Sequence, residues 1–191
     1  QLPYSENIEI QYLSRIFDNT SECYKFFWFQ AILSKVLEGA SFRAKEFIDK
    51  SKSDEFKIHI LDAGCGSGRD AKAFLDAGYR VTALDASKKI CEEAIKLIEQ
   101  EVYCIKFEEL QFQEEFDGIW ACASLLHISF AEIGGVLKRL WNALRVDGIL
   151  YASFKYGEGI RIDKDRLFFN YEETTLNNLM INNGFLINDI F

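Results

Sequence analysis

Three glycines at alternate positions, Gly64, Gly66 and Gly68, are the residues of this chain whose types and spacing most clearly imply chemistry. They follow the apolar run FKIHI, and an acidic residue, Asp85, ends the next apolar run. Glycine accepts positive φ and lets a ligand touch the main chain, and a helix starting after the loop would direct free N–H groups at an anionic group. A carboxylate at a strand end can accept hydrogen bonds from ribose hydroxyls. The pattern predicts a site for a nucleotide-like ligand.

The spacing of the glycines separates two ligand classes. The dinucleotide fingerprint G-x-G-x-x-G requires glycine at position 69, where this chain has Arg69. The third glycine comes one residue earlier, which disfavours a dinucleotide. The alternative without any ligand is a tight strand-to-helix turn, and the acidic residue at the end of the next strand makes this the weaker interpretation.

A scaffold of alternating strands and helices must hold these residues. Apolar runs predict strands, and apolar residues recurring at three- to four-residue steps predict helices. The expected strands are 57–62, 79–85, 101–107, 116–124, 148–155 and 184–191, and the expected helices are 68–78, 88–100, 130–144 and 172–183. This alternation predicts an α/β, Rossmann-like fold, with a mostly parallel sheet and helices on both faces.

The chain divides at the polar stretch SKSDEFK, residues 51–57, which has the composition of a connector. Residues 1–55 carry large apolar side chains at helical spacing and are predicted to form an N-terminal helical cap. Residues 56–191 are predicted to form the ligand-binding domain. With 191 residues, the chain is long enough to bury a full core.

Composition narrows the function classes. The net charge of −8 disfavours a nucleic-acid substrate but leaves it open, since a local basic patch can exist on an acidic protein. No apolar run is long enough to cross a membrane, so no membrane partner is expected. The five cysteines are scattered and lack the spacing of metal ligands, which predicts no metal site and a reducing, cytoplasmic location.

Two segments together resemble a known family. ILDAGCGSGRD followed by YRVTALDAS is similar to the cofactor half of class I S-adenosylmethionine-dependent methyltransferases, nearest to the small-molecule and tellurite-resistance-type members. FDGIWACASLLHI and LKRLWNALRVDGILYASF resemble the later strands of the same family. The resemblance covers residues 57–191. It implies an enzyme that uses S-adenosylmethionine to methylate a small-molecule acceptor by in-line displacement.

The resemblance also implies positions for the cofactor. Asp62 and the loop from Gly64 to Gly68 would surround the methionine part, Asp85 would hold the ribose, and Ala86 would pack on the adenine. Ala121 would lie beside the sulfonium. The family carries an acidic residue near the adenine amino group where this chain has Lys106, so either Phe107 or Glu108 is expected to replace it. The expected cofactor-binding residues are therefore Asp62, Gly64, Cys65, Gly66, Gly68, Asp85, Ala86, Phe107, Glu108 and Ala121.

A general base is needed only when the acceptor must lose a proton. The candidates are His127, in SLLHI, and Tyr156 and Glu158, in KYGEG. Neutral imidazole titrates near working pH and suits a base, whereas the alternative is a structural histidine that caps the loop through a backbone hydrogen bond. The charged stretch YGEGIRIDKDR is expected to be a solvated loop.

Two departures from the family and two rival functions remain. Val146 and Asp147 stand where the family has Pro-Gly, and the sequence stops after one strand where the family's sheet ends in an antiparallel pair. One rival is a nucleic-acid methyltransferase, although the segment ACAS lacks the motif (Asn/Asp)-Pro-Pro-(Tyr/Phe). The other is a non-catalytic module that binds the cofactor or assembles with a partner. A monomer or a homodimer is expected.

Overall fold

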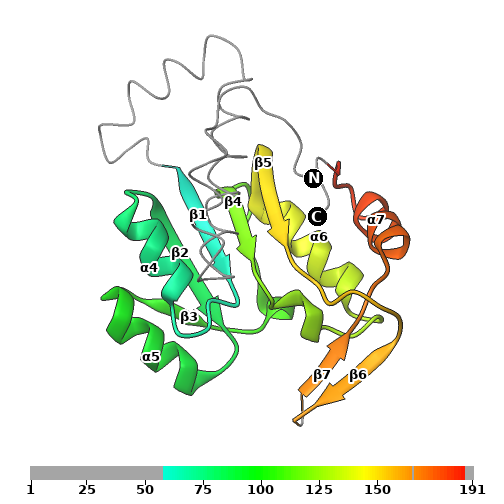
Figure 1. Cartoon of the computed structure of the whole chain (residues 1–191). Helices are drawn as coiled ribbons and strands as arrows, with labels where there is room; N and C mark the ends of the chain where they lie inside the picture. Colours follow the sequence, from blue (N-terminus) through cyan, green and yellow to red (C-terminus); the bar gives the residue numbers. More distant parts are fainter. Residues whose placement is uncertain (1–57, 165, 188–191) are drawn as a thin grey trace, which may run out of the picture. The chain divides into compact units, whose positions relative to one another are not determined.

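The computed structural model describes residues 58–164 and 166–187. Their main feature is a five-stranded parallel sheet with the strand order β3-β2-β1-β4-β5 (Figure 1). Its strands are β1 His59–Ala63, β2 Arg80–Asp85, β3 Val102–Cys104, β4 Phe116–Ala121 and β5 Leu144–Ala152. The predicted α/β, Rossmann-like fold is confirmed. The predicted helical cap over residues 1–55 lies outside the described residues.

Helices pack on both faces of this sheet. The described helices are α4 Arg69–Asp76, α5 Lys88–Ile98, α6 Ile133–Ala143 and α7 Glu173–Asn182, with short 3₁₀ helices η2 Phe107–Glu109 and η3 Leu125–His127. On β4 the ring of Trp120 lies 5.6 Å from that of Phe74 in α4. Its neighbour Ile119 belongs to the cluster that contains the buried side of α6. Successive strand residues face opposite sides, so α4 and α6 cover opposite faces.

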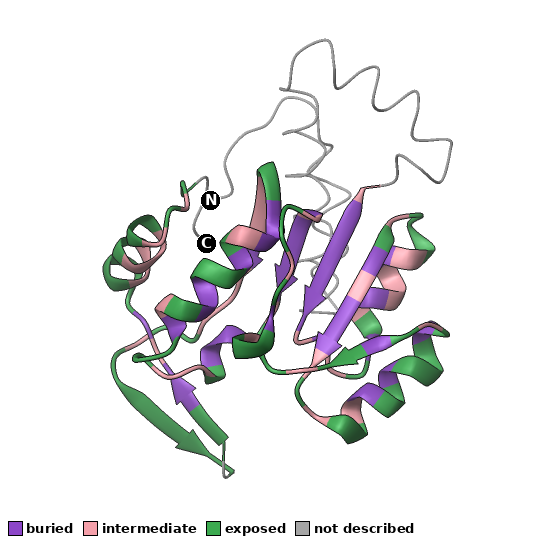
Figure 2. Cartoon of the chain, turned by 180° about the vertical axis from the view of Figure 1, so that it is seen from behind, coloured by how far each residue is buried: buried purple, intermediate pink, exposed green. Residues whose placement is uncertain are grey.

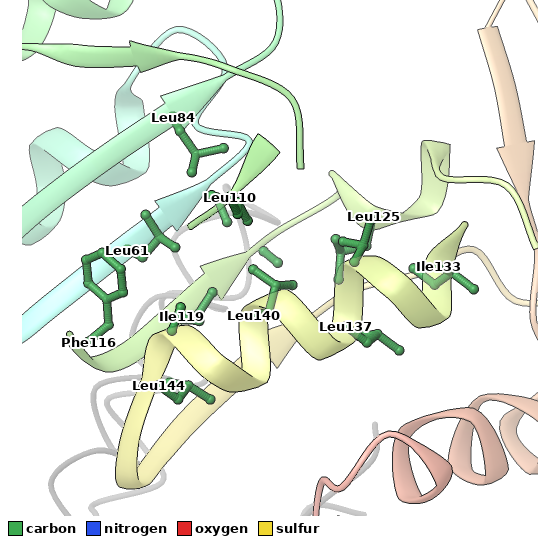
Figure 3. Packing of buried hydrophobic residues seen from close by; sticks show 14 residues of the cluster. Leu61, Leu84, Leu110, Phe116, Ile119, Leu125, Ile133, Leu137, Leu140 and Leu144 are labelled. Atoms are coloured by element: carbon green, nitrogen blue, oxygen red, sulfur yellow. The ribbon is translucent and has the colours of Figure 1, made fainter. Parts of the chain in front are cut away.

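The core on the α6 face is built from leucine and isoleucine side chains of β1, β4 and α6. Figure 3 shows Leu61, Ile119 and Leu140 near one another there and Leu137 further along α6, and each of the four is fully buried. The apolar residues of α6 recur at three- and four-residue steps, which places them on one side of the helix. Each buried leucine contributes about 2 kcal/mol to stability. This packing fixes the carboxyl end of β4 beside that of β1.

Successive strands are added on one side of β1 up to β3, and from β4 onward they are added on its other side. β1 pairs in parallel with β2 on one side and with β4 on the other. The chain leaves β1 toward β2 and β3, then returns across the sheet to β4, so the loops after β1 and β4 diverge. Such a switch point at the carboxyl ends of the strands is where α/β sheets bind ligands. The glycine loop, residues 64–68, lies there.

A second, two-stranded sheet corrects the expectation of a solvated loop over residues 156–166. β6 Ile160–Asp163 pairs antiparallel with β7 Arg166–Phe169, and the hairpin projects away from the main sheet (Figure 1). All four residues of β6 are exposed (Figure 2). The sequence IRID alternates apolar and charged residues, the period of a strand, but the surrounding charges favoured a loop.

Residues 184–187 are not part of any strand, so the first half of the strand predicted at 184–191 is wrong. Gly184 follows α7 with a positive φ of 94°, and the N–H groups of Gly184 and Phe185 bond back to α7 carbonyls. This geometry ends the helix, and the first residues after it cap its carboxyl end instead of starting a strand. Residues 188–191 lie outside the described part of the chain.

One histidine is part of the core. His59 in β1 is 1% exposed, its Nε2 lies 2.8 Å from Thr82 Oγ1, and its ring packs on Phe116. Burial lowers its pKa from 6.5 to about 4, and the cations Arg80 and Arg145 act in the same direction. His59 is therefore neutral in the folded protein at pH 7.

The low pKa of His59 predicts a loss of stability in mild acid. The unfolded chain binds a proton near pH 6.5 and the folded chain only near pH 4, so unfolding becomes more favourable as pH falls between these values. We expect the unfolding free energy to drop by about 2 to 3 kcal/mol between pH 7 and pH 4.5 from this group alone. Urea denaturation of the wild type and of His59→Gln at both pH values measures it. An equal drop in both proteins would contradict the prediction, because every other titrating group is common to them.

Candidate functional site

The glycine loop folds over the end of β2. The N–H groups of Gly64 and Cys65 both donate to the carbonyl oxygen of Leu84, at 2.9 and 2.8 Å. Gly64, Gly66 and Gly68 have φ values of 84°, 55° and 84°. L-residues with a side chain rarely adopt this region, so the path of the loop explains glycine at all three positions. Space around each glycine, however, differs.

Gly64 is glycine because the protein itself approaches it closely. A Cβ at this position would lie 2.4 Å from the Cβ of Ser124. Ser124 follows β4, and its hydroxyl donates to the carbonyl oxygen of Ala63 at 2.7 Å. The loops after β1 and β4 are thus in direct contact at the switch point. The sequence offered no signal for Ser124, because its partner is far away along the chain.

Gly68 meets a second element of the protein. A Cβ there would lie 3.1 Å from a side-chain carbon of Ile98 and 3.2 Å from the Cβ of Ala94, both in α5. Gly68 also precedes the first residue of α4, and its carbonyl oxygen accepts the N–H of Lys72. This glycine allows α4 and α5 to pack closely beside the loop.

Gly66 is the glycine that faces open space, since no described heavy atom lies within 4 Å of where its Cβ would be. Its N–H donates to Asp85 Oδ2 at 3.1 Å, and the N–H of Ser87 donates to Asp85 Oδ1 at 2.9 Å. The half-buried carboxylate of Asp85 is thus directed at the loop. A carboxylate has about four acceptor positions, so two hydrogen bonds leave capacity for further donors.

Asp62 lies beneath the loop and is 2% exposed. Burial raises its pKa well above the ordinary value, and the nearby carboxylates of Asp70 and Asp85 act in the same direction. The N–H of Ala71 in α4 hydrogen-bonds to it, while its Oδ2 has no hydrogen-bond partner among the described residues. A buried oxygen without a partner is costly, so this side chain has acceptor capacity at the start of α4.

The cysteines near the loop are thiols. Burial raises the pKa of Cys65, with Asp62 adding to the effect, and burial likewise raises the pKa of Cys91 to about 11. The thiol of Cys91 donates to the carbonyl oxygen of Asp85. A thiol rather than a thiolate is a poor nucleophile and metal ligand. Among residues 58–164 and 166–187, no cluster of His, Cys, Asp and Glu could hold a metal ion.

The two residues proposed to replace the missing acidic group behave differently. The ring of Phe107 lies 3.6 Å from the position of a Cβ on Gly64 and packs against the core. Glu108 is exposed on η2, where its neighbour Glu109 accepts the N–H of Lys106 at 2.7 Å. Ala86 is exposed beside Asp85. Phe107 therefore lies at the loop. The cofactor contacts expected of Phe107, Glu108 and Ala86 stay predictions.

Two adjacent residues at the end of β4, Trp120 and Ala121, have different surroundings. The side chain of Ala121 is fully buried in the α6-side core, and its carbonyl oxygen accepts the N–H of Ser153. The indole N–H of Trp120 donates to Asp70 Oδ2 at 2.7 Å, which ties β4 to the first turn of α4. The expected contact of Ala121 with the sulfonium stays a prediction, and its side chain faces the core.

The three candidates for a general base lie on two segments. His127 is exposed at the end of η3, where its Nδ1 lies 2.7 Å from the carbonyl oxygen of Leu167 in β7. Tyr156 is 81% exposed and forms a backbone bridge with Tyr171. Glu158 is exposed in the turn before β6. The structure joins His127 to the hairpin, and the catalytic roles of all three stay predictions.

The strand order, the positive-φ glycine loop and the acidic residue at the end of β2 together form the ligand site expected at the switch point of an α/β sheet. The sequence agrees, because residues 60–148 match the family described as Methyltransferase domain. This match agrees with the predicted class of enzyme and with its cofactor, S-adenosylmethionine. No helix in the described part of the chain is long and apolar enough to cross a membrane.

Several known proteins are similar to this chain. Malonyl-[acyl-carrier protein] O-methyltransferase of Acetivibrio thermocellus is 29% identical over 122 residues, which is 61% of this chain and 41% of that protein. Ubiquinone biosynthesis O-methyltransferase of Rickettsia prowazekii is 30% identical over 119 residues, 58% of this chain and 46% of that protein. The chain thus spans less than half the length of these relatives.

The fold has a counterpart in a crystal structure. Burkholderia thailandensis 1,6-didemethyltoxoflavin-N1-methyltransferase, crystallised with 1,6-didemethyltoxoflavin and S-adenosylhomocysteine, superposes with a TM-score of 0.61. The sequences are 23% identical, and the match covers 99% of this chain and 84% of that one. At this identity the likeness supports the fold.

Proposed function

We propose that this protein transfers a methyl group from S-adenosylmethionine to a small-molecule acceptor. The observation that carries the proposal is Gly66, whose Cβ position faces open space while its N–H and the carboxylate of Asp85 meet beside that space. The relatives whose printed names state an acceptor methylate small molecules or a carrier-bound group, which supports the acceptor class. Membership in the tellurite-resistance-type branch is part of the same proposal.

The residues at the switch point fit this cofactor. Asp85 retains acceptor capacity for ribose hydroxyls, and the buried Oδ2 of Asp62 has no hydrogen-bond partner near the amino end of α4. Phe107 offers an apolar ring at the loop. We propose that these groups, with the backbone of Gly64 to Gly68, bind the nucleoside and the methionine part. Asp85 would also place negative charge near a cationic cofactor.

The cofactor supplies a methyl group on a sulfonium, which is an excellent leaving group. The protein then needs to align the acceptor with that methyl group and to exclude water. The loops after β1 and β4, held together by Ser124, provide rigid backbone on which alignment can depend. A base is required only for an acceptor that loses a proton, which is the role proposed for His127, with Tyr156 and Glu158 as alternatives.

Calorimetric titration with S-adenosylmethionine tests the proposal. We expect saturable binding to the full chain and competition by S-adenosylhomocysteine. Release of S-adenosylhomocysteine in the presence of small hydroxylated and amino acceptors tests the transfer. Absence of binding at millimolar cofactor would refute it, and salt-sensitive binding of duplex DNA or tRNA would favour the nucleic-acid alternative. A cytoplasmic location and a monomeric or homodimeric state remain predictions, checked by fractionation and light scattering.

A further inference from the structure

The hairpin β6–β7 has one covered edge and one free edge. At β7, the backbone oxygen of Leu167 lies 2.7 Å from Nδ1 of His127, and the ring centroids of His127 and Phe168 are 4.7 Å apart. The short helix η3 therefore lies against β7. Among the strands of the described residues, β6 pairs only with β7, and the hairpin projects away from the main sheet (Figure 1). The other edge of β6 is therefore available to a further strand.

The hydrogen-bond pattern of the hairpin shows which residues of β6 face that free edge. In an antiparallel pair, alternate residues direct their N–H and C=O groups at the partner strand, and the others direct them away. Just before β6, the carbonyl oxygen of Gly159 accepts the N–H of Asn170, which follows β7. Gly159 therefore faces β7, and so do the residues two and four places further on. The outward N–H and C=O groups are those of the residues between them, Ile160 and Ile162.

The side chains of β6 are apolar on one face and charged on the other. Ile160 and Ile162 are 57% and 71% exposed, and Leu167, opposite Ile162 on β7, is 47% exposed. The other face carries Arg161 and Asp163, which form an exposed ion pair. Proteins commonly protect an exposed edge with proline, lysine or a covering element, whereas the two outward residues of β6 are isoleucines. This edge is therefore suited to pairing with another strand.

The order of residues in β6 is complementary to itself. When two copies of β6 lie antiparallel with their Ile162 residues opposite each other, Arg161 of each copy lies opposite Asp163 of the other. The pairing at Ile162 uses outward N–H and C=O groups on both strands, as a hydrogen-bonded pair requires. A two-fold axis through this pair makes the two Arg–Asp contacts equivalent, as in a C2 dimer. Opposite charges directly across an antiparallel pair stabilise it, and like charges destabilise it.

We propose that this protein forms a symmetric dimer in which the β6 strands of two copies pair antiparallel about Ile162, joining their hairpins into one sheet with the order β7-β6-β6-β7. This dimer goes beyond the proposed function and does not depend on it. A two-stranded hairpin is marginally stable in water, and additional strands stabilise it. The two Ile162 side chains lie on the same face and contact each other across the axis. Because two four-residue strands form a small contact, we expect a dissociation constant of about 10 to 100 µM.

Charge reversal tests the register of this pairing. In Arg161→Asp the facing pairs of a homodimer become Asp–Asp, and in Asp163→Arg they become Arg–Arg. We expect each variant alone to dimerise about tenfold more weakly than the wild type, or worse. In a heterodimer of the two variants, every facing pair again has one Asp and one Arg. We therefore expect an equimolar mixture to dimerise within about threefold of the wild type, which a defect inside either monomer would not allow.

Sedimentation velocity of the full chain over a range of concentrations measures these constants, and thermal melting checks that each variant is folded. Lys72→Asp is the matched control, because it reverses a charge in an exposed ion pair on α4 and should leave dimerisation unchanged. Rescue by mixing supports the dimer. A wild type that is still monomeric at about 500 µM, far above the expected dissociation constant, overturns it. A dimer that both reversals leave unchanged, or two weakened variants that mixing does not rescue, overturns it as well.

Cysteine cross-linking measures the register directly. In a hydrogen-bonded antiparallel pair the facing Cα atoms are about 5.5 Å apart, a separation that a disulfide can span. Ile162→Cys should therefore form a cross-linked dimer under mild oxidation, beyond any formed by the cysteines of the wild type. The two residues at position 160 lie about 13 Å apart in the same register, so Ile160→Cys should not. Equal cross-linking of the two variants would contradict the pairing about Ile162.

Amide exchange distinguishes a second copy from another occupant of the edge. The N–H of Ile162 points outward, so it should exchange rapidly in dilute protein and more slowly at concentrations where the dimer forms. Protection of this N–H that depends on concentration supports the dimer. Protection already present in the monomer would assign the edge to another segment of the same chain, and the dimer would be refuted.

Discussion

Gly64→Ala is expected to destabilise the fold, whereas Gly66→Ala is expected to weaken cofactor binding with only a modest loss of stability. Both glycines have positive φ, so alanine at either position costs about 1 to 2 kcal/mol of backbone strain. At position 64 the new Cβ would also lie 2.4 Å from the Cβ of Ser124, between two loops that are hydrogen-bonded together. Overpacking adds about 1 to 3 kcal/mol, so we expect Gly64→Ala to lose about 3 kcal/mol or more.

At position 66 the new Cβ meets open space in the protein, and that space is where we propose that the cofactor binds. We expect Gly66→Ala to reduce affinity for S-adenosylmethionine at least tenfold, about 1.4 kcal/mol. Gly78→Ala is the matched control, because Gly78 also has positive φ and no described atom within 4 Å of its Cβ position, but it follows the end of α4 away from the loop. It should lose similar stability and keep wild-type affinity.

Urea denaturation and calorimetry measure both effects. Combining Gly64→Ala with Ser124→Gly should recover part of the lost stability, because the double change removes the close contact and leaves the backbone strain. Wild-type stability of Gly64→Ala would disprove the contact with Ser124. Wild-type affinity of Gly66→Ala would show that the cofactor does not lie against this backbone.

These two glycines also mark how far the sequence could predict the site. Their alternation and the strand before them predicted a ligand loop, because local backbone geometry depends on residues that are consecutive in the sequence. The reason for Gly64 could not be found in that way, because Ser124 approaches it only after β4 pairs with β1. The sequence thus located the loop. Only the tertiary structure shows that Gly64 packs against the protein and that Gly66 faces open space.

The secondary-structure elements could likewise be predicted only where the sequence signal was local and long enough. The parallel sheet and helices α4, α5 and α6 were predicted because their apolar periods extend over many residues. The hairpin β6–β7 was missed because its period-two pattern covers only four residues, among charges that favour solvent. β5 begins at Leu144, earlier than expected, with a register shift between Phe116 and Gly118 of β4. Asp147 supplies a positive φ of 63° there, a conformation that aspartate tolerates better than most residues.

Asp85→Asn is expected to have the larger effect on cofactor binding. The two oxygens of Asp85 accept the N–H groups of Gly66 and Ser87, so the carboxylate both shapes the loop and, as we propose, binds the ribose. Asparagine has one acceptor oxygen and directs an NH₂ group at the other donor. Hydrogen bonds to a charged group contribute about 1.5 to 3 kcal/mol each. We expect affinity for S-adenosylmethionine to fall about 100-fold, about 2.7 kcal/mol.

The control must separate this loss from the removal of one negative charge near a cationic cofactor. Asp76→Asn removes the same charge from the exposed end of α4, where Asp76 is paired with Lys72, and we expect at most a threefold change in affinity, about 0.7 kcal/mol. Adenosine, which has the ribose but no positive charge, is a second probe. If Asp85 acts through ribose hydroxyls, its substitution should weaken adenosine and S-adenosylmethionine by similar factors. A loss confined to the charged ligand would assign Asp85 to electrostatics and leave the sugar to other groups.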